Sequence, residues 1–253
     1  MVHGFGEDGT VWNNQVDYLQ DKFKLIVPDL PGSGKSEMID DMSMEGLAEV
    51  IKTIINAESG NPPVIASNAK QEGRKAWSII GHSMGGYITL ALVEKYPGLV
   101  SAFGLFHSSA FADSEEKKAT RRKGIEFINQ HGAFEFLKTA TPNLFSPVTK
   151  EEKPELIDKQ VAASDNFLPR ALVSYYEAMM QRPDRTRVLK ETAVPVLFIM
   201  GKYDAAVPVE DTLKQCHLPG KSYIHVLQNS GHMGMLEESE KATLFLDAFL
   251  REN

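Results

Sequence analysis

Short apolar segments alternate with longer segments of helical periodicity along much of the chain. Five segments are predicted to be strands: FKLIVP (23–28), AWSIIG (76–81), SAFGLFH (101–107), VPVLFIMG (194–201) and SYIHVLQ (222–228). Helices are predicted near residues 43–57, 84–96, 208–217 and 236–252. This alternation is typical of an α/β fold, in which helices flank a mostly parallel sheet.

The alternation stops between residues 111 and 190, where helical segments follow one another and no strand is predicted. Five prolines divide this region: Pro142, Pro147, Pro154, Pro169 and Pro183. We expect residues 111–190 to form a helical cap, or lid, inserted into a core made of residues 1–110 and 191–253. A helical layer that only packs on the core is the alternative.

Two further segments are marked by their composition. The last predicted helix carries Leu244, Phe245, Ala248 and Phe249 at helical spacing, and we expect this face to dock on the sheet. Residues 57–74 are polar and contain glycine and proline, and they suggest no function.

Composition excludes several classes of protein. Of the 253 residues, 42% are hydrophobic and 24% are charged, as in ordinary globular proteins, and no apolar run approaches the ~20 residues that span a bilayer. The formal net charge of -7 argues against a nucleic-acid partner, because phosphate binding needs a basic surface. We therefore expect a small-molecule partner and neither nucleic acid nor membrane, while the oligomeric state stays open.

The cysteine and histidine content bears on compartment and cofactors. Cys216 is the single cysteine, so it cannot form an internal disulfide, and we expect it to be a buried structural thiol. The first residues lack the basic and apolar regions of a secretory signal, and we expect a cytoplasmic protein. No Cys/His cluster has the spacing of metal ligands, so we expect no metal and no cofactor.

The segment AWSIIGHSMGG contains the pattern G-x-S-x-G, from Gly81 to Gly85, between a predicted strand and a predicted helix. A sharp turn at this point requires small neighbours, and it exposes the Ser83 hydroxyl above the strand ends. Ser83 is therefore the candidate nucleophile. A glycine-rich turn with an incidental serine is the alternative.

A serine hydroxyl needs a base, and the base needs an orienting acid. Asp204 follows the strand VPVLFIMG, and His232 follows the strand SYIHVLQ between two glycines. Serine, acid and histidine in this order are expected for a triad on a parallel α/β sheet. The other histidines lack such a setting, including His107, which follows a strand directly before the lid.

The negative oxygen that forms during attack on a carbonyl needs N–H donors. Met84 follows the serine at a helix N-terminus and is expected to supply one. The turn HGFG at residues 3–6 is expected to supply the second through the Phe5 amide. A simple glycine-rich turn is the alternative for HGFG.

The segment DLPGSGKS (29–36) looks like a phosphate-binding loop, but that loop needs a glycine where Asp29 stands. In the order HGFG, DLPGSGKS, GHSMGG, GKYDAAVP and SGHMG, the motifs resemble those of the α/β-hydrolase family, specifically its small capped esterase- and lactonase-like members. The resemblance covers almost the whole chain. It implies Ser83, Asp204 and His232 as the triad, and it explains DLPGSGKS as a structural turn.

One feature departs from the resemblance. In that family a strand leads directly into the HG turn, but here only Met1 and Val2 precede His3. We therefore expect the N-terminal strands of the sheet to be missing or truncated. The segment PPVIAS (62–67) or a partner chain could complete the sheet instead.

These features predict a serine hydrolase that cleaves a small carboxylic ester or lactone through an acyl-enzyme intermediate. The same triad could instead serve carbon–carbon bond hydrolysis, a lyase reaction or acyl transfer. A small-molecule receptor with slow or no turnover is an alternative of another class. Aromatic residues and methionines in the lid, such as Phe136, Tyr175 and Tyr176, suit an apolar substrate group or simply the core of the lid.

Overall fold

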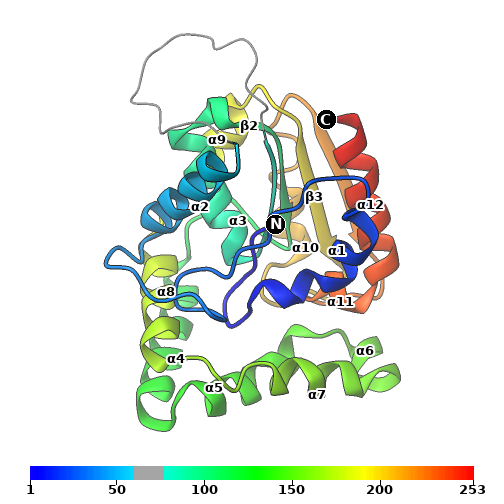
Figure 1. Cartoon of the computed structure of the whole chain (residues 1–253). Helices are drawn as coiled ribbons and strands as arrows, with labels where there is room; N and C mark the ends of the chain where they lie inside the picture. Colours follow the sequence, from blue (N-terminus) through cyan, green and yellow to red (C-terminus); the bar gives the residue numbers. More distant parts are fainter. Residues whose placement is uncertain (60–76) are drawn as a thin grey trace.

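A computed structural model describes residues 1–59 and 77–253 of the chain. Its sheet has four parallel strands in the order β1 (Trp77–His82), β2 (Val100–Phe106), β3 (Val196–Gly201) and β4 (Ser222–Leu227). Four of the five predicted strands are thus confirmed. Figure 1 shows the strands side by side at the centre of the molecule, with helices around them.

The register brings the carboxyl ends of the strands to one edge of the sheet. Gly81 of β1 lies opposite Leu105 of β2, and Phe106 of β2 lies opposite Ile199 of β3. Loops that follow β1, β2, β3 and β4 therefore meet at this edge, where ligands bind in open parallel sheets.

Two residues at the start of the chain extend the sheet beyond β1. Val2 forms a parallel bridge with Gly81; its N–H donates to the carbonyl of Ile80 at 2.8 Å and its carbonyl accepts from His82 N–H at 2.9 Å. This contact places the HGFG turn at the carboxyl end of β1. The segment PPVIAS lies outside the described residues, so its predicted role stays untested.

The prediction of a strand at FKLIVP is wrong. The amino group of Met1 donates to the carbonyl of Ile26 at 2.6 Å, which is the segment's link to the N-terminus. A cavity of about 750 Å³ separates the segment from β1, and its walls include Leu25, Ile26 and Ile79. A strand is defined by pairing with a neighbour, and among residues 1–59 and 77–253 the segment has no such partner across this cavity.

Helices cover both faces of the sheet. The helices α1 (Asn13–Leu19) and α12 (Ser239–Glu252) lie on one face, and α2 (Met44–Glu58) and α3 (Met84–Lys95) lie on the other (Figure 1). Ten of the twelve residues of α3, from Met84 to Val93, are buried, because this helix packs between the sheet and α2. Two short helices, α10 (Val209–Leu213) and α11 (Gly234–Glu237), complete the core.

The predicted docking face of the last helix is only partly right. Ala242, Leu246 and Phe249 are buried against the core, whereas Leu244 is 47% exposed. Both sets of residues have helical spacing, so periodicity alone could not select between them.

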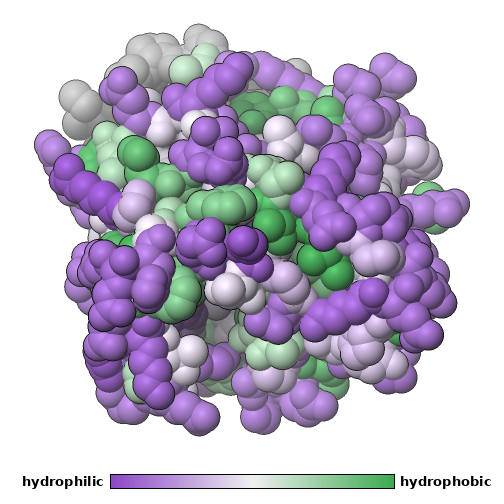
Figure 2. All heavy atoms as spheres, turned by 90° about the horizontal axis from the view of Figure 1, so that it is seen from below, coloured by the Kyte–Doolittle hydropathy of each residue, from purple (hydrophilic) through white to green (hydrophobic). Residues whose placement is uncertain are grey.

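Helices fill the chain between β2 and β3, and residues 111–190 contain no strand, as predicted. They are α4 (Glu115–His131), α5 (Ala133–Ala140), α6 (Pro147–Glu152), α7 (Pro154–Ala162), α8 (Pro169–Gln181) and α9 (Thr186–Glu191). In Figure 1, α4 to α7 lie below the sheet. Figure 2 views the molecule from that side and shows mostly hydrophilic side chains, with apolar ones between them.

Several hydrogen bonds fasten this helical region to the core, and two of them are short. The Tyr175 hydroxyl of α8 donates to the carbonyl of Pro31 at 2.6 Å. The N–H of His232 donates to the carbonyl of Leu144 at 2.6 Å, just before α6. Across residues 1–59 and 77–253, every helix is too short or too polar to cross a membrane.

Candidate active site

Ser83 occupies a strained turn between β1 and α3. Its backbone angles are φ 51° and ψ -115°, and its N–H donates to the carbonyl of Phe106 at 2.9 Å. A Cβ atom on Gly81 would lie 2.3 Å from the carbonyl oxygen of Gly85, and one on Gly85 would lie 2.4 Å from the carbonyl oxygen of Val2. The sequence G-x-S-x-G is therefore a steric requirement of this turn.

Asp204 and His232, predicted from separate loops, are in direct contact. The Nδ1 atom of His232 lies 2.8 Å from Oδ2 of Asp204, and both side chains are buried. The other carboxylate oxygen, Oδ1, accepts from the N–H groups of Ala206 at 2.9 Å and Val207 at 2.8 Å. With Nδ1 donating to the carboxylate, Nε2 of His232 is free to accept a proton.

Charge and burial oppose each other in this pair. Burial favours the neutral form of Asp204, but the charge of His232 and the hydrogen bonds from His107 and His232 hold the pKa of Asp204 well below its usual range. Burial also lowers the pKa of His232, but the charge and hydrogen bond of Asp204 raise it more, so that this pKa lies above its ordinary value. The pair thus combines an ionised acid with a strengthened base.

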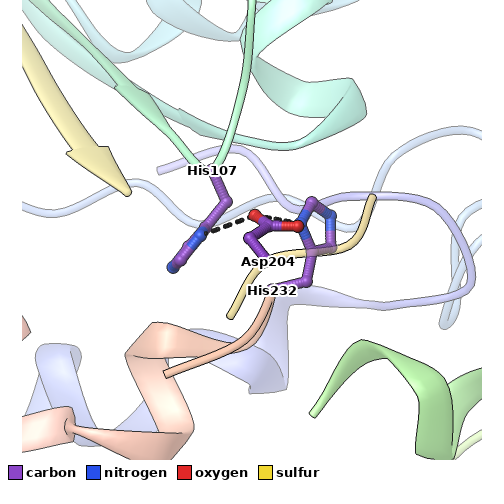
Figure 3. A group of neighbouring side chains, drawn as sticks. All are labelled: His107, Asp204 and His232. Carbon is purple, nitrogen blue, oxygen red and sulfur yellow. Dashed lines mark hydrogen bonds and ion pairs between the residues drawn. The ribbon is translucent and has the colours of Figure 1, made fainter. Parts of the chain in front are cut away.

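A second histidine, which sequence reasoning did not assign, contacts the same carboxylate. Nδ1 of His107 lies 2.9 Å from Oδ2 of Asp204, as Figure 3 shows. Burial lowers the pKa of His107 to about 4, although its hydrogen bond to Asp204 acts in the opposite direction. Its position directly after β2, at the edge that also carries Asp204 and His232, is the signal that could have identified it.

Another buried pair lies behind the serine turn. His82 directs Nδ1 to Oε2 of Glu7 at 2.9 Å and Nε2 to the carbonyl of His232 at 2.9 Å. The Glu7 carboxylate also accepts from Gly4 N–H at 2.7 Å. His82 and Glu7 therefore join the HGFG turn, the serine turn and the loop that carries His232.

The HGFG turn lies against the serine. A Cβ atom on Gly4 would lie 3.1 Å from Cβ of Ser83, so the backbone of this turn and the serine side chain are neighbours. Met84 is the first residue of α3, and its N–H belongs to the unpaired helix N-terminus. Within residues 1–59 and 77–253, no protein acceptor takes the N–H of Phe5 or of Met84. Both predicted oxyanion donors thus have an N–H available.

The aromatic side chain of Phe5 contacts α5 and α8 of the helical region. Its ring stacks on Tyr176 with a centroid distance of 4.2 Å and meets Phe136 edge-on at 6.2 Å. Tyr175 also meets the Phe5 ring edge-on at 6.4 Å, and it is fully buried and hydrogen-bonded to the core. All three rings therefore meet Phe5 of the HGFG turn, and Tyr175 also anchors α8 to the core.

The segment DLPGSGKS forms a turn that is held by the side chain of Asp29. The Asp29 carboxylate accepts from Gly9 N–H at 2.9 Å and from Lys35 N–H at 3.1 Å, and the Ser36 hydroxyl donates to the Asp29 carbonyl at 2.8 Å. The side chain that excludes a phosphate thus holds the turn together. This observation supports the structural interpretation of the motif.

A buried glutamate fastens the His232 loop to the helical region. One oxygen of Glu237 accepts from the N–H groups of Gly231 at 2.8 Å and Met233 at 3.1 Å. The other oxygen accepts from Ser146 N–H at 2.8 Å and from the Thr149 hydroxyl at 2.7 Å. Glu237 thus fixes both sides of the histidine and the start of α6 at once.

The cluster of His107, Asp204 and His232 also has the composition of a metal site, since its potential ligand atoms lie within 4.8 Å of one another. Hydrogen bonds already engage them. Nε2 of His107 accepts from Gly234 N–H at 3.2 Å, so the His107 proton lies on Nδ1, which faces the carboxylate. A metal ion would have to displace this proton and the one on His232. We therefore interpret the cluster as a hydrogen-bond network.

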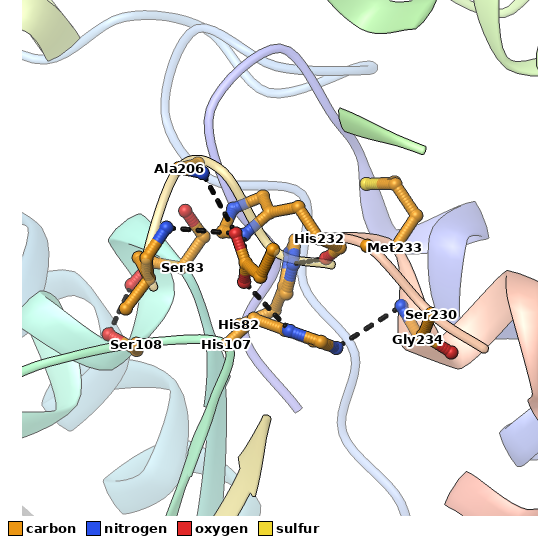
Figure 4. Close-up of polar contacts among 12 residues, drawn as sticks. His82, Ser83, His107, Ser108, Ala206, Ser230, His232, Met233 and Gly234 are labelled. Atoms are coloured by element: carbon orange, nitrogen blue, oxygen red, sulfur yellow. Dashed lines mark hydrogen bonds and ion pairs between the residues drawn. The ribbon is translucent and has the colours of Figure 1, made fainter. Parts of the chain in front are cut away.

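Figure 4 shows this network around Ser83 and His232, with Ser108 donating to the carbonyl of Ser83 at 2.7 Å.

Cys216 lies elsewhere, in the core. It is buried, and burial raises the pKa of its thiol to about 11, which suits a structural side chain rather than a nucleophile.

Most of the chain matches a known protein family. Residues 1–244 match the profile described as the alpha/beta hydrolase family. The chain belongs to this family. Its parallel sheet with flanking helices is that of an α/β-hydrolase fold, as the sequence predicted.

Individual relatives are distant. A thermophilic esterase from Thermogutta terrifontis has 29% sequence identity and a TM-score of 0.89, with 99% of this chain and 88% of that chain covered. A 2-hydroxy-6-oxononadienedioate/2-hydroxy-6-oxononatrienedioate hydrolase from Burkholderia vietnamiensis is 25% identical over 99% of this chain and 86% of its own length.

Protein ABHD8 from Bos taurus is 25% identical over 99% of this chain but over only 55% of its own length. The chain thus spans about half the length of the ABHD8 proteins. Within the family, the relatives include an esterase and a hydrolase of a different substrate class, so the family leaves the reaction open.

Proposed function

We propose that this protein is a serine hydrolase that cleaves a small carboxylic ester or lactone. The observation that carries the proposal is the buried hydrogen bond between Asp204 and His232, 2.8 Å long, at the sheet edge where Ser83 stands on its strained turn. The likeness to the Thermogutta esterase supports the substrate class. The helices of residues 111–190 would act as the cap over the substrate.

The proposed reaction uses these residues in order. Oγ of Ser83 attacks the carbonyl carbon while its proton moves to Nε2 of His232, and Asp204 stabilises the imidazolium. The N–H groups of Phe5 and Met84 bind the oxyanion. The ester C–O bond then breaks, and His232 returns the proton to the leaving alkoxide. Water then attacks the acyl carbon while His232 takes its proton. The bond to Ser83 breaks, and His232 returns the proton to Oγ of Ser83.

A panel of chromogenic acyl esters of rising chain length tests this proposal. We expect the protein to hydrolyse the short esters and Ser83→Ala to lose about 10⁴-fold or more in kcat/KM. Ser101→Ala is the matched control, because Ser101 lies at the opposite, amino end of β2, and it should keep full activity.

A folded protein that hydrolyses no ester would remove the esterase proposal. The alternative reactions would then be distinguished by their products, because carbon–carbon bond hydrolysis, elimination and acyl transfer each form a different product. A receptor would bind a ligand, raise its own Tm and leave the ligand intact.

A further inference from the structure

His107 has a single proton, and its position can be assigned from the partners of the ring. Its Nε2 atom lies 3.2 Å from the N–H of Gly234, which can only donate. Nε2 must therefore accept, and the proton lies on Nδ1, 2.9 Å from Oδ2 of Asp204. His107 is thus a neutral donor to the carboxylate, with both ring nitrogens used.

The backbone around His107 is strained, and a neighbouring residue is small enough to leave room for its ring. His107 has a positive φ of 49°, which is rare for a residue other than glycine. A Cβ atom on Gly234 would lie 2.4 Å from its Nε2, so this glycine leaves room for the ring. An apolar side chain could fill this volume without burying a polar ring. Backbone strain and a buried polar group together point to a functional role.

We propose that His107 is a positioning residue, which fixes the Asp204 carboxylate and shares with His232 the oxygen on which the catalytic imidazole depends. This proposal rests on the proposed function, because it assigns His107 a role in the same triad. His107 does not touch the reacting atoms. It acts through Asp204, which accepts two N–H groups on Oδ2 and two on Oδ1.

Sharing the oxygen weakens the attraction between Asp204 and protonated His232. An N–H donor withdraws negative charge from a carboxylate oxygen, so the second donor makes that oxygen a poorer partner for the first. Loss of the His107 donor should therefore raise the pKa of His232. The other ionisable groups that face His232 are Asp204, Glu7, Glu237 and His82, and they remain in place when only His107 changes.

The test compares His107→Leu with His107→Asn in the pH profile of kcat/KM. Leucine removes the donor, whereas asparagine keeps an N–H near the position of Nδ1 and tolerates a positive φ. We expect His107→Leu to move the midpoint of the acidic limb upward by about one pH unit and to lose about tenfold in kcat. His107→Asn should return the midpoint close to that of the wild type.

A folded His107→Leu protein with an unmoved midpoint would overturn the proposal, since a residue that only packs would lower kcat without moving the limb. The proposal would also fail if His107→Asn behaved like His107→Leu. Circular dichroism establishes whether each variant is folded.

A second measurement needs neither a variant nor a substrate. In the ¹⁵N-histidine NMR spectrum of the wild type, the His107 ring should stay neutral with its proton on Nδ1 from about pH 5 to 9, while His232 titrates. Titration of His107 in this range, or a proton on Nε2, would overturn the proposal. Because no ester is involved, this result stands apart from failure of the proposed function.

Discussion

Asp204 accepts four hydrogen bonds through two oxygens. Replacing one of these oxygens by an NH₂ group therefore removes two acceptor positions at once. In Asp204→Asn, the amide oxygen can keep the two backbone donors, so the NH₂ group then faces His107 and His232. The His232 proton would move to Nε2, where it blocks proton transfer from Ser83. We expect kcat to fall by about 10⁴-fold, measured with the best ester of the panel.

Asp211→Asn is the matched control, because Asp211 lies in α10 and its carboxylate pairs with Lys214 at the surface. It should retain wild-type kcat. Equal losses in the two variants would contradict the assigned role of Asp204.

The pH dependence of activity follows from the His232 imidazole. Only the neutral ring can accept the serine proton, and Asp204 raises the pKa of this ring above the ordinary 6.5. Activity should therefore be lost as the pH falls through a midpoint above 6.5, and be full at higher pH. The pH profile of kcat/KM measures this midpoint. A midpoint below 6.5 would mean that burial outweighs the carboxylate.

At the level of single residues, the sequence identifies those that belong to motifs. Ser83, Asp204 and His232 each follow a strand and stand in a marked turn, so their candidacy could be predicted. His107 also follows a strand and could have been a candidate on that ground, but Glu7 could not, because its partner His82 lies 75 positions away and no local pattern records the pairing. Buried polar side chains acquire their role from contacts that only the folded chain supplies.

The serine turn is the element on which the site depends most directly. In Gly81→Ala, the new methyl group would lie 2.3 Å from a backbone oxygen, which cannot move aside as a side chain could. We expect a loss of about 3 kcal/mol or more in the free energy of unfolding, measured by urea denaturation. Gly220→Ala, where a Cβ meets nothing within 4 Å, should stay within about 0.5 kcal/mol of the wild type.

Glu237 of α11 allows a second test, of the loop that carries His232. Its two oxygens accept four donors, and Glu237→Gln would turn an NH₂ group toward two of them. We expect a loss of about 1 to 3 kcal/mol in the free energy of unfolding, together with a lower kcat as the His232 loop loosens. Glu240→Gln, at an exposed position in the next helix, should change neither quantity appreciably. Equal stability of the two variants would argue that Glu237 does not hold the His232 loop and the start of α6 together.

Elements could be predicted where a local pattern coincides with a partner in space. The runs that became β1 to β4 are apolar and pair with one another across the sheet. FKLIVP has the same composition, but a cavity separates it from β1. Periodicity describes a segment's preference, whereas the presence of a neighbouring strand decides its structure.

For the whole molecule, the contacts between core and helical region predict joint unfolding. Tyr175 bonds to Pro31, Leu144 accepts from His232, and Arg185 after α8 pairs with Glu94 of α3 at 2.9 Å. These bonds join residues 111–190 to the core at several points. We expect one calorimetric transition with equal van't Hoff and calorimetric enthalpies. Two separate transitions would show that the helical region unfolds independently.

The sequence also predicted the overall arrangement, because strands, helices and a helical insertion alternate in a recognisable order. It could not predict how the two residues before His3 would join the sheet. Val2 provides that link with a single bridge to Gly81, a contact between positions 79 residues apart in the chain.

Covalent labelling by a fluorophosphonate tests the central claim most directly, with intact mass spectrometry, peptide mapping and ester hydrolysis followed on the same sample. We predict one adduct per chain, on Ser83, with hydrolysis lost in proportion to labelling, and no adduct on Ser83→Ala. Hydrolysis that continues in fully labelled protein, or an adduct on another residue, would contradict the assignment of Ser83 as the nucleophile.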